Sequence, residues 1–166
     1  METGTGVRRL VIHDLEKNPI QPDADADVAC SNGSMEPCVG CYSCWVATPG
    51  KCALRDGWEH MGWRIANCDE LVIVSRCVYG GVSAFVKNVL DRSIPYLHPD
   101  FEMVSGRMHH KQRYEQKRKL RVFFYGKISA GEQTTAKRWV DAMAINMNLS
   151  VECVSFSEEA PKEVCL

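Results

Sequence analysis

Four cysteines lie close together in the sequence between Pro37 and Trp58, in the run P-C-V-G-C-Y-S-C-W-V-A-T-P-G-K-C-A-L-R-D-G-W. They are Cys38, Cys41, Cys44 and Cys52, separated by two, two and seven residues. Thiolates two residues apart can turn toward one centre, and a fourth from a short loop completes the set that a four-iron four-sulfur cluster or a tetrahedral zinc ion needs. Packing as small hydrophobic residues and a role as reactive thiols are the alternatives, because free cysteine is often buried.

The length and composition favour one cytoplasmic domain. The chain has 166 residues and a net charge of −1, so overall charge gives no reason to expect a nucleic acid or a membrane as partner. No apolar run approaches the ~18 residues of a membrane span, and the first residues lack the pattern of a signal peptide. The nine cysteines are an odd number, which argues against a disulfide framework. We expect a single domain over residues 1–166.

Hydrophobic patterns predict the elements that must position these cysteines. Strands are expected at 7–15, 28–31, 70–75, 120–125 and 151–156, because each has an apolar β-rich centre. Helical spacing predicts helices at 57–67, 84–93 and 132–147. Asp56 and Ser83 precede the first two helices and are their expected N-terminal caps, and Ser129 or Gly131, together with Glu132, is expected to start the third.

Strands that alternate with helices predict a parallel sheet joined by right-handed crossovers. Five strands in this arrangement suit an α/β fold of the flavodoxin-like type, with strand order 2-1-3-4-5 and helices on both faces. Residues 16–27 contain prolines and no helical stripe, so the first crossover is expected to be shortened. In such sheets ligands bind outside the carboxyl ends of the strands, between the first and third. His13 ends the first strand there, and we interpret it as a hydrogen-bonded structural residue, with a catalytic role as the alternative.

Besides the Cys-rich loop at 37–56, a second irregular segment at 94–119 is expected to leave the sheet as an excursion. Its basic run at 107–121 is interpreted as a solvated surface, with an anion contact as the alternative. The two histidines in it, His109 and His110, are interpreted as surface residues. The apolar and aromatic side chains between Ile94 and Met103 exceed what one domain can bury, so we expect a homodimer.

The cysteine run, together with L-V-I-V-S-R-C-V-Y-G-G-V-S-A-F-V-K-N-V-L-D-R-S-I-P-Y-L-H-P, resembles the NAD(P)H-dependent FMN reductase and iron-sulfur flavoprotein group. The resemblance implies FMN as cofactor and a four-iron four-sulfur cluster bound by the four cysteines named above. It also implies that the loop after the third strand wraps the flavin ring. The cofactor-binding residues expected from it are Ser75, Arg76, Cys77, Tyr79, Gly80 and Gly81.

Two positions depart from the family pattern. The loop after the first strand reads H-D-L-E-K-N-P-I-Q-P, so Asp14 and Glu16 stand where the family holds the FMN phosphate at the start of a helix. Arg76 stands at a bend that faces the ring. It would contact a phosphate or a flavin carbonyl, or fill the site of a protein that has lost flavin. A thiolate at Cys77 would be reactive if Arg76 favoured it, and a small loop residue is the alternative.

The sequence therefore predicts an oxidoreductase that passes electrons from NAD(P)H or a redox protein, through FMN and a Cys-ligated cluster, to a small-molecule or protein acceptor. No catalytic acid or base is assigned, because a flavin carries out the electron transfer itself. The alternative is a non-catalytic zinc- or iron-binding sensor module on a flavodoxin-like scaffold that has lost FMN. A weaker alternative is a thiol-disulfide protein that uses a C-x-x-C pair.

Overall fold

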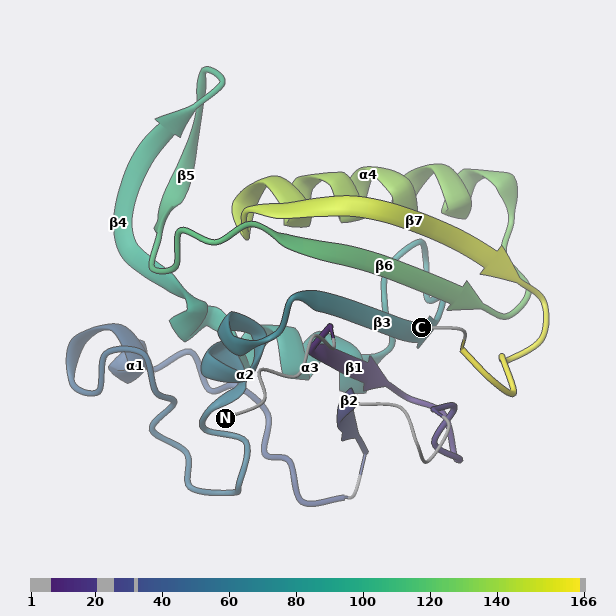
Figure 1. The fold of residues 1–166 in the computed structure, drawn as a ribbon, viewed down its shortest axis with the longest axis horizontal. Coiled ribbons are helices and arrows are strands. Elements are labelled where there is room, and N and C mark those ends of the chain that lie inside the picture. Colours follow the sequence, from purple (N-terminus) through teal and green to yellow (C-terminus); the bar gives the residue numbers. More distant parts are fainter. Residues whose placement is uncertain (1–6, 21–25, 32, 165–166) are drawn as a thin grey trace.

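Five parallel strands form the central sheet of the computed structural model, which describes residues 7–20, 26–31 and 33–164 (Figure 1). In spatial order they are β2 (Ala26–Cys30), β1 (Arg9–His13), β3 (Glu70–Arg76), β6 (Arg118–Tyr125) and β7 (Leu149–Ser157). Each neighbouring pair is parallel. The predicted flavodoxin-like strand order is therefore confirmed. In β3, residues 70–75 are all buried, as expected for a strand that is covered on both faces.

The helices of the described residues are α1 (Ser43–Val46), α2 (Met61–Asn67), α3 (Ala84–Arg92), the 3-10 helix η1 (Ile94–Tyr96) and α4 (Ala130–Asn146). Two predicted caps are confirmed: Ser83 accepts the Val86 N–H, and Ser129 forms a capping box with Glu132. None of the described helices is long and apolar enough to cross a bilayer.

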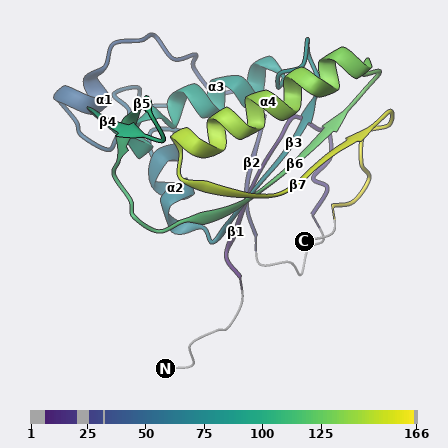
Figure 2. The same cartoon turned by 90° about the horizontal axis from the view of Figure 1, so that it is seen from above.

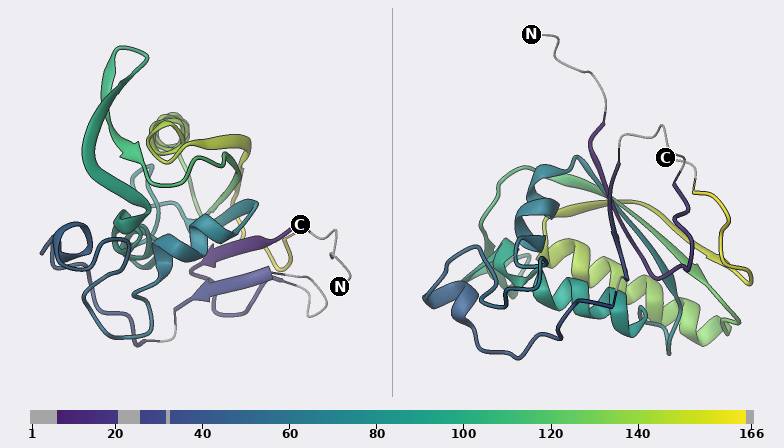
Figure 3. Two further views of the ribbon diagram at one scale, coloured as in Figure 1. Left: turned by 60° about the vertical axis from the view of Figure 1, so that its left-hand side comes forward. Right: turned by 90° about the horizontal axis from the view of Figure 1, so that it is seen from below.

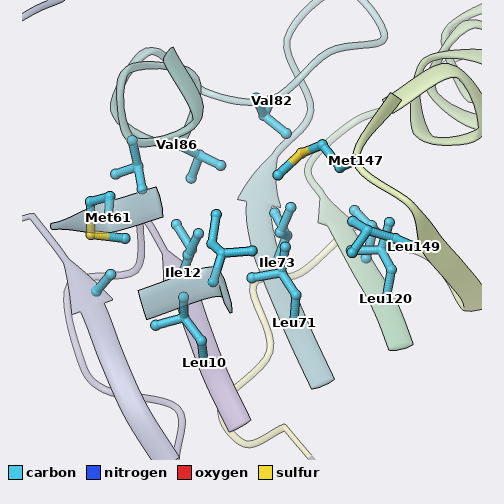
Figure 4. Close-up of a cluster of buried hydrophobic side chains, with 14 of the residues drawn as sticks. Leu10, Ile12, Met61, Leu71, Ile73, Val82, Val86, Leu120, Met147 and Leu149 are labelled. Carbon is cyan, nitrogen blue, oxygen red and sulfur yellow. The ribbon is translucent and has the colours of Figure 1, made fainter. Parts of the chain in front are cut away.

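One face of the sheet carries all the sheet-covering helices of the described residues (Figure 2). Side chains from β1, β3 and β6 meet α2, α3 and α4 there in one continuous core. In Figure 4, the side chains of Leu10, Ile12 and Ile73 point from the sheet toward the side on which Met61 and Val86 lie. The apolar stripes read from the sequence therefore belong to helices that pack on this face.

The opposite face differs from the expected arrangement with helices on both sides. Val11, Val72 and Val74 lie on it and are fully buried, yet the described residues from outside the sheet that pack on them belong to loops. Ile20 and Val164 pack there, joined by a hydrogen bond from the Val164 N–H to the Pro19 carbonyl at 3.0 Å. The described part of the connection from β1 to β2 ends at Ile20, which packs on this face, and it contains no helix.

The segment expected to be an irregular excursion contains an ordered two-stranded hairpin, here called the arm. It consists of β4 (Leu97–Val104) and β5 (Arg107–Gln112), which stand away from the main sheet (Figure 3, left). Ser105 and Gly106 both have positive φ, 50° and 77°, as a two-residue hairpin turn requires. The expected absence of regular structure over 94–119 was wrong, because turn geometry and cross-strand pairing order this segment despite its weak periodicity.

Arg118 is a buried cation that stabilises the fold. Its guanidinium donates to the Ala66 carbonyl near the end of α2 and to the Tyr96 hydroxyl at 3.0 Å, and it lies over the Tyr114 ring. We expect Arg118→Ala to lower the free energy of unfolding by about 2–4 kcal/mol, because it leaves a buried carbonyl without its donor. Urea denaturation measures the change, with the exposed Arg138→Ala as control. A loss below about 1 kcal/mol would show that Arg118 is dispensable.

Candidate functional site

The four cysteines singled out by the sequence line one pocket, here called the cysteine pocket, with a volume of about 220 Å³. Cys38 and Cys41 are exposed, whereas Cys44 and Cys52 are buried. As the side chains stand in the described residues, no three Cys, His, Asp or Glu groups converge closely enough to hold a single metal ion. The structure thus brings the four cysteines around a shared volume, and their binding of a metal centre stays a prediction.

Tight turns bring the cysteines together. Gly40 and Gly50 have φ values of 64° and 85°, in the left-handed region that glycine adopts without a steric penalty. Two backbone hydrogen bonds then close the loop. The Gly50 N–H donates to the Cys44 carbonyl at 3.1 Å, and the Cys52 N–H donates to the Glu59 backbone carbonyl at 3.0 Å. The glycines that interrupt the sequence pattern therefore fold the loop around the pocket.

Arg92, at the end of α3, holds this loop in place. Its side chain is fully buried and forms a two-pronged ion pair with Asp56, with both N–O distances 2.8 Å. It also donates to the Glu36 carbonyl at 2.7 Å and to the Cys52 sulfur at 3.1 Å. The pairing keeps the pKa of Asp56 far below its usual value. Sequence reasoning missed Arg92, since nothing local to it indicates a partner 36 residues away.

The expected role of Asp56 as a helix cap was wrong. Its carboxylate accepts the Trp58 N–H at 3.1 Å, but α2 begins only at Met61 and is preceded by His60. The ion pair with Arg92 draws the carboxylate toward α3 instead. The apolar side chains of Trp58, Met61 and Ile65, within the predicted range 57–67, are buried.

The thiols of the pocket differ in their acidity. Burial and the nearby Cys52 and Cys41 raise the pKa of Cys44 to about 11. Hydrogen bonds from the Ser43 hydroxyl and backbone lower the pKa of Cys41. At a given pH, Cys41 therefore has more of the nucleophilic thiolate form than Cys44.

The flavin loop expected from the resemblance is a compact turn. Val78 and Gly81 exchange backbone hydrogen bonds of 2.8 and 3.0 Å, while Tyr79 and Gly80 both have positive φ. Tyr79 is 90% exposed at the tip, an uncommon conformation for an aromatic residue. A Cβ at Gly80 would lie 2.6 Å from Thr135, so glycine is needed for the turn to pack against α4.

Two other residues of this loop face inward. Ser75 is fully buried, and its hydroxyl accepts the Ser83 N–H at 2.8 Å, so it shapes the loop. Cys77 is half-buried, and burial raises its pKa. Arg76 is not among the groups that shift this pKa, so the structure favours the alternative of Cys77 as a small loop residue. Arg76 itself is exposed at the end of β3.

A second pocket of about 870 Å³, here called the strand-end pocket, lies at the carboxyl ends of β1, β3 and β6. Its lining combines the loop after β1, the first residues of α3 and the segment after β7: Asp14, Leu15, Glu16, Lys17, Ser31, Arg76, Ser83, Ala84, Phe85, Tyr125, Ala160, Pro161 and Lys162. The contribution of residues 160–162 was not anticipated from the sequence, which marks them only as a polar tail. This pocket occupies the predicted ligand position of the fold.

The residues after β1 do not fit a phosphate at this position. The Asp14 carboxylate accepts hydrogen bonds from the Arg76 backbone N–H and from the Tyr125 hydroxyl, both at 3.0 Å. These two donors at the strand ends are therefore already paired. Glu16 lines the same pocket, and the counter-charges there, Lys17, Arg76 and Lys162, are all exposed to solvent. Like charges at this position would repel a dianion, and no helix N-terminus follows β1 in the described residues.

His13 is structural, as interpreted from the sequence. Only 1% of it is exposed, and its Nδ1 accepts the Leu15 N–H at 3.2 Å. Burial lowers its pKa, so the ring is neutral at neutral pH. Its other nitrogen, Nε2, has no hydrogen-bond partner in the part of the chain that the structure describes.

An aromatic row connects the cysteine pocket to the arm. Tyr42 stacks on Trp45 at 5.5 Å, Trp45 contacts His110 at 4.9 Å, and His110 contacts Phe101 at 4.5 Å between ring centroids. The interpretation of His110 as a surface residue was incomplete, because it is half-buried in this row. Phe101 faces His110, and Met103 pairs with Met108 two residues further along, so one face of the arm is apolar.

We expect iodoacetamide to label Cys41 faster than Cys44 in metal-free folded protein at pH 8, because Cys41 is exposed and has the lowered pKa. Mass spectrometry of peptides at successive times gives the two rates. In denatured protein the rates should converge, which serves as control. Equal rates in the folded state would contradict the described environment of the two thiols.

Comparison with known proteins identifies two kinds of relative. No protein-family model matches the chain. Over 68 residues, 41% of the chain, it is 31% identical to an iron-sulfur flavoprotein of Methanocaldococcus jannaschii and 30% identical to one of Archaeoglobus fulgidus. The matched segment spans only about a third of these relatives, 34% and 30% of their lengths.

Similar solved structures extend over almost the whole chain. A flavone reductase has a TM-score of 0.56 at 11% identity, covering 91% of this chain and 54% of its own. An FMN-dependent NADH-azoreductase from Bacillus anthracis, in complex with FMN, has a TM-score of 0.52 at 10% identity, covering 90% and 85%. These structures agree in fold, and the resemblance read from the sequence is confirmed. The chain thus has a flavodoxin-like fold and is similar, over part of its length, to the iron-sulfur flavoproteins.

Proposed function

We propose that the protein is an oxidoreductase of the iron-sulfur flavoprotein type, with an iron-sulfur cluster in the cysteine pocket and a flavin at the strand-end pocket. The observation that carries the proposal is that Cys38, Cys41, Cys44 and Cys52 line one pocket. The partial similarity to iron-sulfur flavoproteins supports it independently. NAD(P)H or a small redox protein is the proposed donor, and a small molecule or second redox protein is the proposed acceptor.

The cysteine pocket fits a cluster in both donor type and size. A zinc ion draws its sulfurs to about 2.3 Å from one point, whereas a cluster of several irons takes its thiolates from around a larger body. The pocket of about 220 Å³, with a cysteine on several of its walls, suits the larger body. Cys38, Cys41, Cys44 and Cys52 would hold the cluster, and the exposure of Cys38 and Cys41 gives iron access during loading.

The helix α3 connects the two pockets. Its first residues, Ala84 and Phe85, line the strand-end pocket, and its last residues, Asp91 and Arg92, line the cysteine pocket. Nine residues at 1.5 Å each make this helix about 14 Å long. When bound, a flavin would accept an electron pair and release the electrons one at a time, which is how a cluster accepts them. The rigid helix would fix the separation between the two groups.

The residues present fit the ring of FMN but not its phosphate. The turn at Tyr79 and Gly80 is present for a ring, but Asp14 occupies the phosphate position. Of the predicted cofactor-binding residues, only Arg76 lines the strand-end pocket, whereas Tyr79, Gly80 and Gly81 lie in the turn between Arg76 and Ser83, which both line it. We assign the ring side of the site to Arg76 and to this turn, with Ser75 and Cys77 supporting the loop. FMN, the flavin implied by the resemblance, is expected to bind without the usual phosphate contacts.

The second candidate function is a Cys-metal sensor or binding module that has lost flavin. The position of the Asp14 carboxylate favours it, because that group takes the place of an external anion. Both functions share the cysteine pocket. Flavin binding distinguishes them.

We also propose that the chain forms a single domain that works as a homodimer in the cytoplasm. Phe101, Met103 and Met108 on the arm are 57%, 65% and 67% exposed, which is an apolar surface for a second copy to cover. A reducing compartment keeps exposed thiols such as Cys38 and Cys41 available for iron.

The cluster is tested by purifying the protein without oxygen and measuring its visible spectrum and iron content. We expect a brown protein with about four irons per chain, as a four-iron cluster requires. Cys41→Ser should remove most of the colour, whereas Cys153→Ser, in β7, should retain it. A colourless wild-type protein with one zinc would favour the sensor module, and colour that survives Cys41→Ser would rule out the ligand set.

Flavin binding is tested by titrating protein into FMN or riboflavin and following flavin fluorescence. Tyr79→Ala should weaken both ligands by up to about tenfold through lost aromatic contact. Asp14→Asn should strengthen FMN but not riboflavin, because only FMN has a phosphate near that carboxylate. Lys127→Ala, on the neighbouring loop, controls for a general effect of surface mutation. Unchanged binding by Tyr79→Ala would refute the ring position, and no binding of either flavin would favour the sensor module.

A further inference from the structure

The sulfur of Cys52 accepts a hydrogen bond from a buried cation. Arg92 Nε donates to Cys52 Sγ at 3.1 Å, and the Arg92 side chain is fully buried. In the described residues, this guanidinium reaches none of the other three pocket sulfurs. The four predicted ligands are therefore unequal before any metal binds, because one of them has a charged donor.

The direction of this N–H bond is fixed by the rest of the guanidinium. Both terminal nitrogens are held by Asp56 at 2.8 Å, and one of them also donates to the Glu36 carbonyl at 2.7 Å. A planar guanidinium held at its terminal nitrogens cannot turn, so the remaining Nε–H stays aimed at the sulfur. Asp56 thus acts on Cys52 through Arg92.

A cluster that gains an electron places part of the added negative charge on its ligating sulfurs. A cationic N–H donor at such a sulfur stabilises the reduced form more than the oxidised form and raises the reduction potential. Because Arg92 is buried, solvent screens this interaction little. The Asp56 carboxylate, whose oxygens bind the far side of the guanidinium, offsets part of the positive charge.

We propose that Arg92 is a positioning residue that raises the reduction potential of the metal centre held by Cys52, and that Asp56 orients it and limits the size of the effect. This inference rests on the proposed function, since it requires a redox-active centre in the cysteine pocket. The inference goes beyond that function because it assigns the control of the reduction potential to the buried Arg92–Asp56 ion pair, which is not one of the predicted metal ligands.

The test is a redox titration of the anaerobically loaded protein, with iron per chain measured first. Arg92→Gln keeps N–H groups of similar reach but removes the charge. We expect its potential to fall by an amount that corresponds to at least a tenfold change in the ratio of reduced to oxidised centre, about 59 mV for one electron. The control is Arg64→Gln, which breaks a similar pair with Asp27 away from the pocket.

A purely structural role would lower the iron content without moving the potential of the loaded fraction. An unchanged potential in loaded Arg92→Gln would therefore overturn the proposal. If Arg92→Gln binds no iron, Asp56→Asn decides, because it keeps the cation beside Cys52 and removes its counter-charge. Its potential should then rise above that of wild type.

The inference is refuted if the reduction potential of Asp56→Asn is equal to or lower than that of wild type, or if both variants lose their iron. In either case a purely structural role of the ion pair would explain the result. The proposed function fails separately, if the wild-type protein itself binds no iron.

Discussion

The buried ion pair between Arg92 and Asp56 is the interaction on which the cysteine pocket depends. It joins the end of α3 to a loop that has little regular structure of its own, and it adds contacts to Glu36 and Cys52. Removing one partner of such a pair leaves an uncompensated buried charge, which typically costs 3–5 kcal/mol. The turns at Gly40 and Gly50 can form the loop, and this pair is the buried ionic contact that holds the loop against the folded core, beside hydrogen bonds such as that from the Cys38 N–H to Asn88.

The sheet shows a different constraint at its other end. With no helix after β1 in the described residues, Asp14 bridges the ends of β1, β3 and β6 through the Arg76 N–H and the Tyr125 hydroxyl. An internal carboxylate thereby satisfies donors at the carboxyl ends of the strands, which is where open α/β sheets bind their ligands. The face of the sheet that carries no helix in the described residues is covered by loop residues such as Ile20 and Val164. Covering it in this way takes fewer residues than a helix would.

The arm places aromatic and apolar side chains beside the cysteine pocket. Trp45 links them, because its ring contacts His110 and its indole N–H donates to the Leu97 carbonyl at 3.0 Å. The arm, the cysteine loop and α3 therefore meet in one region of the molecule. An electron-transfer partner or a second copy that covered the arm would also approach the pocket.

The sequence by itself determined the sheet and the three long helices, because buried parallel strands and amphipathic helices leave local periodic patterns, as in residues 70–75 and around Ser129. It also singled out the four cysteines by their spacing. Tertiary structure alone decided that Arg92 reaches Cys52 and Asp56, that Asp14 fills the strand ends, and that residues 160–162 close the second pocket. These contacts join residues far apart in the chain, and their energy comes from burial and charge pairing that no local pattern records.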